Sequence, residues 1–252
     1  MSSPEEAGLW GPERGLYAFV GNYGSGKTEI ALNTVLQGRK QGITPATIID
    51  LDVINPYFRS REVEDELISR DVRLVSPKGK LRDADLPIIT AEAKGAINEN
   101  KGITILDIGG EDTGATVVRP YRQALNRPDT RLCLVVNTRR PFTADVDGIL
   151  AAAERIEKRI GLPISHLVNN TNLIDETDIT ILTQGQHMVL QAASKMNKPL
   201  LFTAVLTDYL DKATSLIAGS PLFPIKRFML PPWYEDVKRL SPIKDRRRKL
   251  II

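Results

Sequence analysis

Gly-Asn-Tyr-Gly-Ser-Gly-Lys-Thr, residues 21–28 of this chain, matches the pattern G-x-x-x-x-G-K-[ST] at every fixed position. The apolar run at residues 16–20 comes just before it and predicts a buried strand. Residues 29–41 follow, with apolar side chains at the spacing of an amphipathic helix. Strand, glycine loop and helix therefore occur in the order that a phosphate-binding loop requires, which a chance glycine turn would not explain.

The residue types of this loop fit the binding of a nucleoside triphosphate. Backbone amides of the loop, and the positive end of the helix after it, bind phosphate oxygens. We expect Lys27 to reach the β- and γ-phosphates, as a binding and catalytic residue, and the Thr28 hydroxyl to ligate Mg²⁺. The predicted nucleotide-binding residues of this segment are Gly21, Asn22, Tyr23, Gly24, Ser25, Gly26, Lys27, Thr28 and Glu29.

Length and composition predict one large α/β domain at residues 15–231, after a flexible start at 1–14 and before a basic tail at 232–252. The sequence has no run of about 18 apolar residues, so no transmembrane helix is expected. The first residues lack the apolar core of a signal peptide, and we expect a cytoplasmic protein. The net charge is +3, yet residues 238–249 hold seven Lys or Arg and one Asp, which leaves the remainder at −3. The basic character thus belongs to the tail.

Cysteine and histidine are too scarce for several classes of site. The single cysteine, Cys133, excludes an internal disulfide and lies in an apolar run, where we expect a buried strand. The two histidines, His166 and His187, lie far apart in the sequence. A metal site built from His and Cys is therefore not expected.

Strands and helices alternate along the whole chain. This order predicts a doubly wound, mostly parallel sheet with helices on both faces. The further predicted strands are 47–52, 72–75, 103–108, 131–137, 165–170, 200–206 and an edge strand at 225–230. The further predicted helices are 61–70, 90–98, 116–125, 144–160, 178–196 and 207–218. In such sheets ligands bind at the carboxyl ends of the strands.

Carboxylates stand at two of these strand ends. Asp50 and Asp52 close the second strand, and Asp107 closes the strand at 103–108, followed by Gly109 and Gly110. Next to Mg²⁺ and a γ-phosphate, a carboxylate holds the water shell of the metal or orients an attacking water. We therefore expect Asp50 and Asp107 at the metal, together with Thr28. The two glycines leave backbone amides free to contact the γ-phosphate and to move when it departs.

The strand at 165–170 ends in asparagines, which bear on the choice of base. An Asn-Lys-x-Asp tetrad, which would recognise guanine, does not occur in the chain. An asparagine amide both donates to and accepts from the edge of adenine, so Asn170 favours ATP over GTP; an Asx turn is the structural alternative. Arg59 and Arg61 follow the second strand, and two functions stay open for them, sensing the γ-phosphate or pairing across a dimer, against a solvated place at a helix start. The pair at 139–140 is equally open and receives no assignment.

Together these residues resemble the MinD/ParA/nitrogenase-reductase group of P-loop ATPases, the SIMIBI class. The likeness rests on residues 21–28, on Asp50-Leu51-Asp52 and on Asp107-Ile108-Gly109-Gly110, and extends over about residues 15–210. It implies that Asp50 holds water on Mg²⁺, that Asp52 positions the attacking water and that Asp107 anchors the second switch. It also implies a homodimer around two ATP molecules and a partner protein that reads the nucleotide state.

The chain departs from that group at Asn22, where the group carries a signature lysine that crosses the dimer. Two alternatives to an ATPase switch stay open. One is a small-molecule kinase or ligase like dethiobiotin synthetase, in which Asp52 faces an acceptor and residues 77–87 cover it. The other is an adaptor that binds nucleotide without hydrolysis. The tail mixes apolar and cationic residues, which would suit contact with an anionic membrane or an acidic surface as well as simple packing on the domain.

Overall fold

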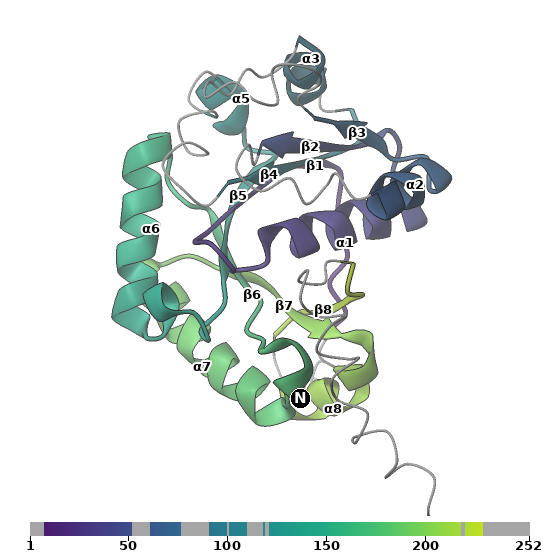
Figure 1. The fold of residues 1–252 in the computed structure, drawn as a ribbon. Helices are drawn as coiled ribbons and strands as arrows, with labels where there is room; N and C mark the ends of the chain where they lie inside the picture. Colours follow the sequence, from purple (N-terminus) through teal and green to yellow (C-terminus); the bar gives the residue numbers. More distant parts are fainter. Residues whose placement is uncertain are drawn as a thin grey trace, which may run out of the picture.

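The computed structural model describes residues 8–51, 61–76, 91–99, 101–109, 118, 121–217 and 220–228. These residues form an eight-stranded sheet in the order β3-β2-β4-β1-β5-β6-β7-β8 (Figure 1). Every neighbouring pair of strands is parallel. The strands are β1 (Gly15–Val20), β2 (Ala46–Leu51), β3 (Arg73–Val75), β4 (Ile103–Ile108), β5 (Thr130–Val136), β6 (His166–Asn169), β7 (Leu200–Leu206) and β8 (Leu222–Ile225).

Helices cover both faces of the sheet, which confirms the predicted doubly wound α/β fold. Helices α1 (Lys27–Lys40) and α2 (Arg61–Ser69) pack on one face. The opposite face is covered by α3 (Ala91–Glu99), α5 (Arg122–Leu125), α6 (Val146–Ile160) and α7 (Ile179–Met196). A last helix, α8 (Leu210–Leu216), packs beside β7.

The central strands are buried on both faces, which explains why they read as apolar runs. Every residue of β1, β2 and β4 is buried. Along β1 the side chains alternate between the two cores: Leu16 and Ala18 contact the α6 side, whereas Tyr17 and Phe19 contact the α1 side. Strands covered by helices on both faces show this near-continuous hydrophobicity.

Capping residues set the bounds of the two long helices of the α6–α7 layer. The Asp145 carboxylate accepts a hydrogen bond from the amide of Gly148 at 2.7 Å, and α6 ends at Gly161. The Asp178 carboxylate caps α7 in the same way, from the amide of Ile181 at 2.8 Å. A short acceptor at this position satisfies an amide that has no partner inside the helix.

Some predicted bounds were wrong. The edge strand lies at Leu222–Ile225 and not at 225–230, because Pro224, which reads as a strand breaker, is tolerated on an edge strand. The predicted helix 207–218 is a 3₁₀ turn, η6 (Thr207–Tyr209), followed by α8. Within the described residues, the predicted helix 116–125 is helical only over Arg122–Leu125. The loops predicted at 53–60 and 77–87 lie outside the described residues.

Leu9 and Trp10, which belong to the start predicted to be flexible, pair with β8. Leu9 forms a parallel bridge with Leu222, and the Trp10 amide donates to the Leu222 carbonyl at 2.8 Å. The indole of Trp10 lies 4.3 Å from the ring of Phe202 and 4.9 Å from that of Phe223, between ring centroids. This aromatic cluster covers the outer end of the sheet on the α1 side.

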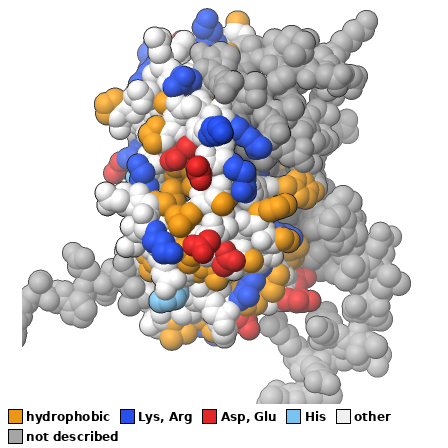
Figure 2. Space-filling model, turned by 90° about the vertical axis from the view of Figure 1, so that its left-hand side faces the viewer, with side chains coloured by type: hydrophobic (Ala, Val, Ile, Leu, Met, Phe, Trp, Pro, Cys, Tyr) orange, Lys and Arg blue, Asp and Glu red, His pale blue; other side chains and the backbone are white. Residues whose placement is uncertain are grey.

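Cys133 lies in β5 and is fully buried, as predicted. Burial raises the pKa of its thiol far above the usual range, so the side chain acts as a small apolar core residue. The face seen in Figure 2 carries Lys, Arg, Asp and Glu side chains interspersed with smaller apolar patches. Within the described residues no helix is long and apolar enough to cross a membrane.

Candidate functional site

The loop between β1 and α1 has the backbone shape of a phosphate cradle. Gly24 and Gly26 adopt φ of 75° and 83°, in the left-handed region that glycine enters without strain. The Ser25 amide donates to the Asn22 carbonyl at 3.2 Å and closes the turn. No side chain caps the first amides of α1, so they face the loop at the positive end of the helix.

Lys27 folds back over this loop. Its ammonium Nζ donates to the Asn22 carbonyl at 3.3 Å, and only 6% of the residue is exposed. Tyr23, by contrast, is 61% exposed on the outer surface of the loop. Within the described residues, two further polar atoms of the loop, Asn22 Nδ2 and Ser25 Oγ, are buried without a hydrogen-bond partner. A ligand that supplies acceptors fits this lining.

The predicted metal residues converge beside the first turn of α1. The Thr28 hydroxyl donates to Asp107 Oδ2 at 2.6 Å. Asp107 is fully buried, and its Cα partner across the β2–β4 pair is Asp50, which is 4% exposed. Ile48 and Ile105, two residues earlier, both pack on the α1 side, so the two carboxylates face that side as well.

This set of oxygen donors fits Mg²⁺. A hydroxyl and carboxylates are hard ligands of the kind that magnesium takes, with phosphate oxygens and water completing its octahedron. Within the described residues, no group of three His, Cys, Asp or Glu side chains would hold a metal by protein ligands alone. The residues present therefore suit an ion that arrives with a nucleotide.

Two loops from neighbouring strands hold the phosphate loop in place. The Asn170 amide, just after β6, donates to the Ser25 carbonyl at 2.8 Å, and this residue is 4% exposed. Arg140, after β5, donates from Nε to the Gly24 carbonyl at 3.0 Å. In this structure the Asn170 side chain contacts the backbone of the phosphate loop, whereas the sequence predicted a contact with the base. The contact of Arg140 was missed, because it joins residues 116 apart in the sequence and no local pattern records it.

The Glu29 side chain points toward the chain after β8. Its carboxylate accepts from the Phe228 amide at 2.7 Å, and from Asn33 Nδ2 at 3.3 Å. Asn33 also pairs with both backbone groups of Lys226: its Nδ2 donates to the carbonyl at 2.9 Å and its Oδ1 accepts from the amide at 2.8 Å. Glu29 was predicted to bind nucleotide, yet its side chain fastens residues 226–228 to α1.

Replacing Asn33, which is buried, with alanine should lower the free energy of unfolding by about 1–3 kcal/mol, because two partly buried hydrogen bonds to the Lys226 backbone are lost. Urea unfolding followed by circular dichroism measures the change. Lys40→Ala, at the exposed end of the same helix, is the control and should stay within about 0.5 kcal/mol of the wild type. We call these contacts of Asn33 and Glu29 with residues 226–228 the clamp. Equal stability of Asn33→Ala and the wild type would show that the clamp does not stabilise the fold.

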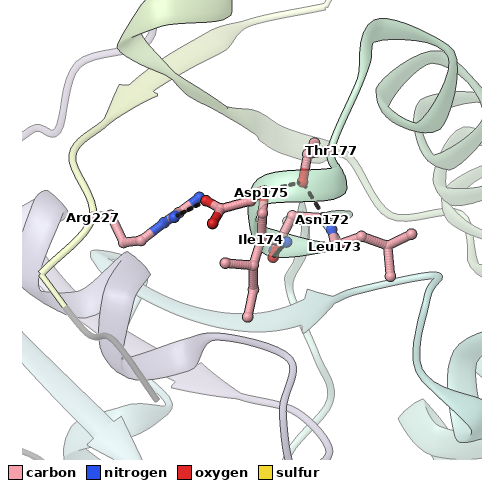
Figure 3. Close-up of polar contacts among 6 residues, drawn as sticks. All are labelled: Asn172, Leu173, Ile174, Asp175, Thr177 and Arg227. Carbon is pink, nitrogen blue, oxygen red and sulfur yellow. Dashed lines mark hydrogen bonds and ion pairs between the residues drawn. The ribbon is translucent and has the colours of Figure 1, made fainter. Parts of the chain in front are cut away.

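The loop after Asn170 forms a compact turn that contacts residues 226–228 through Arg227 (Figure 3). The Asn172 side chain donates to the Asn170 carbonyl at 2.8 Å, and Thr177 Oγ1 accepts from the Leu173 amide at 2.8 Å. Asp175 pairs with Arg227, Oδ1 to Nη1, at 2.8 Å. Residues 226–228 therefore join the helix after the phosphate loop to the loop after β6.

Several predicted residues lie outside the described part of the chain. These are Asp52, Gly110, Arg59 and the tail at 232–252. Gly109 follows β4 directly. Arg61 is the first residue of α2, and its side chain is not among those described.

The sheet order, the glycine loop between β1 and α1 and the adjacent Asp107 define the fold of a P-loop nucleoside triphosphatase. No protein-family model matches the chain, and no curated protein matches it. Solved structures do. FtsY from Mycoplasma mycoides matches with a TM-score of 0.51 and 17% identity, over 79% of this chain and 62% of that one.

Two further solved structures show the same likeness. Chloroplast FtsY from Physcomitrella patens matches with a TM-score of 0.52 and 17% identity, over 80% of this chain and 61% of that one. The signal recognition particle 54 kDa protein from Aeropyrum pernix K1, in complex with GDP, matches with a TM-score of 0.50 and 18% identity, over 80% and 42%. The chain thus spans less than two thirds of each protein, and the likeness concerns the fold.

Proposed function

We propose that this protein binds Mg²⁺ and a nucleoside triphosphate, with ATP as the nucleotide, and that slow hydrolysis switches it between two states. The observation that carries the proposal is the hydrogen bond between Thr28 and Asp107 at 2.6 Å, next to Lys27 on a glycine loop. Hydroxyl, carboxylate and ammonium groups are what a magnesium–triphosphate complex requires at this position.

Each of these residues has a defined task in the proposed reaction. The amides of the loop and Lys27 bind the phosphates, and Lys27 exchanges the Asn22 carbonyl for phosphate oxygens. Thr28 and Asp107, with Asp50 beside them, hold the ion, which when bound neutralises charge on the outer phosphates. Asp52, two residues beyond Asp50, is proposed to orient the attacking water.

ATP is preferred in this proposal because of the loop after β6. The guanine-specific Asn-Lys-x-Asp tetrad, whose carboxylate accepts from the ring N–H and amino group of guanine, does not occur there. Asn169-Asn170-Thr171-Asn172 stand at the end of this strand instead. GTP is the second candidate. It is favoured by the solved structure of the 54 kDa protein, which contains GDP.

Calorimetric titration with ATP and GTP, each with and without Mg²⁺, tests the proposal together with phosphate release on the same sample. We expect ATP to bind at least about tenfold more tightly than GTP, a difference of about 1.4 kcal/mol, and EDTA to weaken binding. Tighter binding of GTP would overturn the choice of base. Absence of binding by either nucleotide would overturn the function.

The nucleotide state is proposed to be read by a partner protein, as in the MinD/ParA group that the sequence resembles. Hydrolysis would then be slow alone and faster with that partner. Asn22 in place of the signature lysine argues for a site completed within one chain, whether or not the protein forms a homodimer. A cytoplasmic location, with the basic tail touching an anionic membrane or acidic surface, belongs to the same proposal.

A further inference from the structure

Arg140 lies directly against the phosphate loop. Its Nε donates to the Gly24 carbonyl at 3.0 Å. A Cβ added at Gly24 would lie 3.0 Å from that Nε and 3.3 Å from Cζ, so the guanidinium covers the α-carbon of this residue closely. Both the contact and the φ of 75° at Gly24 require glycine at this position.

The backbone that carries Arg140 is fixed on both sides. Its amide donates to the Asn137 carbonyl at 3.1 Å, and its carbonyl accepts from the Thr143 amide at 3.0 Å. The Thr143 hydroxyl donates to the same Asn137 carbonyl at 2.7 Å, and both residues are buried. The cation is therefore held at the loop before any ligand arrives, which reduces the cost of ordering it.

Charge at the phosphate loop supplies the reason for such a residue. The second position of the loop is Asn22, which is neutral, so Lys27 is the one cation that the loop itself provides. A guanidinium has five N–H donors in a planar fork that suits phosphate. Within the described residues, the Arg140 guanidinium donates one of these five N–H groups, Nε–H, to the Gly24 carbonyl.

We propose that Arg140 contacts the outer phosphate of the bound nucleoside triphosphate, acting within its own chain as a charge-stabilising arginine. An arginine supplied in this way stabilises the charge that builds up on the transferred phosphoryl group, and it is worth about 10³–10⁵ in turnover where it has been measured. The inference rests on the proposed function, because it needs a triphosphate in the loop.

Arg139 offers a matched control. It is the neighbouring residue with the same charge, but it is exposed and its guanidinium bonds to Gln184 Oε1 on α7. If only the positive charge of this surface mattered, replacing either arginine would weaken ATP binding by the same factor. If Arg140 contacts a phosphate, only the replacement of Arg140 would weaken ATP binding.

The test compares Arg140→Gln, Arg140→Lys and Arg139→Gln with the wild type, in the affinities for Mg·ATP and Mg·ADP and in phosphate release. We expect Arg140→Gln to lower the affinity for Mg·ATP at least about tenfold, while the affinity for Mg·ADP changes less than about threefold. Phosphate release should slow by about 100-fold or more. Arg140→Lys should recover part of the ATP affinity, and Arg139→Gln should match the wild type. Melting temperatures show whether each variant is folded.

The outcomes separate this inference from the function on which it rests. Equal weakening of ATP and ADP by Arg140→Gln, or no change in either, would mean that Arg140 only braces Gly24, and would overturn the inference. If the wild type prefers guanine nucleotides, GTP and GDP replace ATP and ADP with the same expectations. If the wild type binds no nucleotide, the proposed function fails and this inference fails with it.

Discussion

Replacing Lys27 with alanine is expected to weaken the binding of Mg·ATP by about 100-fold or more. The ammonium lies over the loop at 3.3 Å from the Asn22 carbonyl and is 6% exposed, so a phosphate bound there meets it away from bulk water. Removing one partner of such a buried charge pair costs about 2–5 kcal/mol, which corresponds to about 30- to several-thousand-fold in affinity.

Calorimetry on Lys27→Ala and on Lys40→Ala measures this effect. Lys40 ends the same helix at an exposed position, so its variant has the same charge change away from the loop. We expect the Lys40 variant to bind like the wild type. If both variants bind Mg·ATP with wild-type affinity, the triphosphate does not lie on this loop.

Replacing Thr28 with valine should remove the dependence of nucleotide binding on Mg²⁺ and slow phosphate release by about 100-fold or more, since metal stabilisation of the outer phosphates is worth several kcal/mol. Valine keeps the shape of threonine but has no hydroxyl to ligate the ion or to donate to Asp107. The buried carboxylate also loses this donor, so stability should fall by about 1–3 kcal/mol.

Thr28→Ser is the matched control for this variant, because it restores the hydroxyl in a smaller side chain. Titrations with ATP in Mg²⁺ and in EDTA give the metal dependence of each variant. We expect serine to keep it and valine to bind ATP as weakly in Mg²⁺ as the wild type does in EDTA. A valine variant that retains full metal dependence would place the ion away from Thr28.

The sequence predicted the parts of this site that follow from local pattern and sheet geometry. The spacing of residues 21–28 predicted the loop, and the carboxyl ends of parallel strands predicted that Asp50 and Asp107 would come together. The fold class followed from the alternation of strands and helices, and the sheet confirms it. In each case a local pattern, combined with the general geometry of parallel sheets, carries the signal.

Contacts between distant parts of the chain could not be predicted in this way. Asn170 is 145 residues from the Ser25 carbonyl that it binds, and Glu29 is 199 residues from the Phe228 amide. No periodicity or spacing records such pairs. The same limit applies to Arg140, because its contact with Gly24 forms only when folding brings the loop after β5 against the phosphate loop.

The contacts of residues 226–228 link the helix after the phosphate loop to the loop after β6. Asn33 and Glu29 hold this segment from α1, and Arg227 holds the loop after β6 through Asp175. The stability of Asn33→Ala, measured as above, shows how firmly the two parts are joined.

A crystal structure with Mg²⁺ and a non-hydrolysable ATP analogue tests the central claim most directly. We expect the triphosphate on the amides of residues 24–28, with Lys27 Nζ moved from the Asn22 carbonyl to the outer phosphates and Thr28 Oγ1 about 2.0–2.1 Å from the ion. A loop left empty at saturating analogue, with Lys27 still on Asn22 and Thr28 still on Asp107, would contradict it.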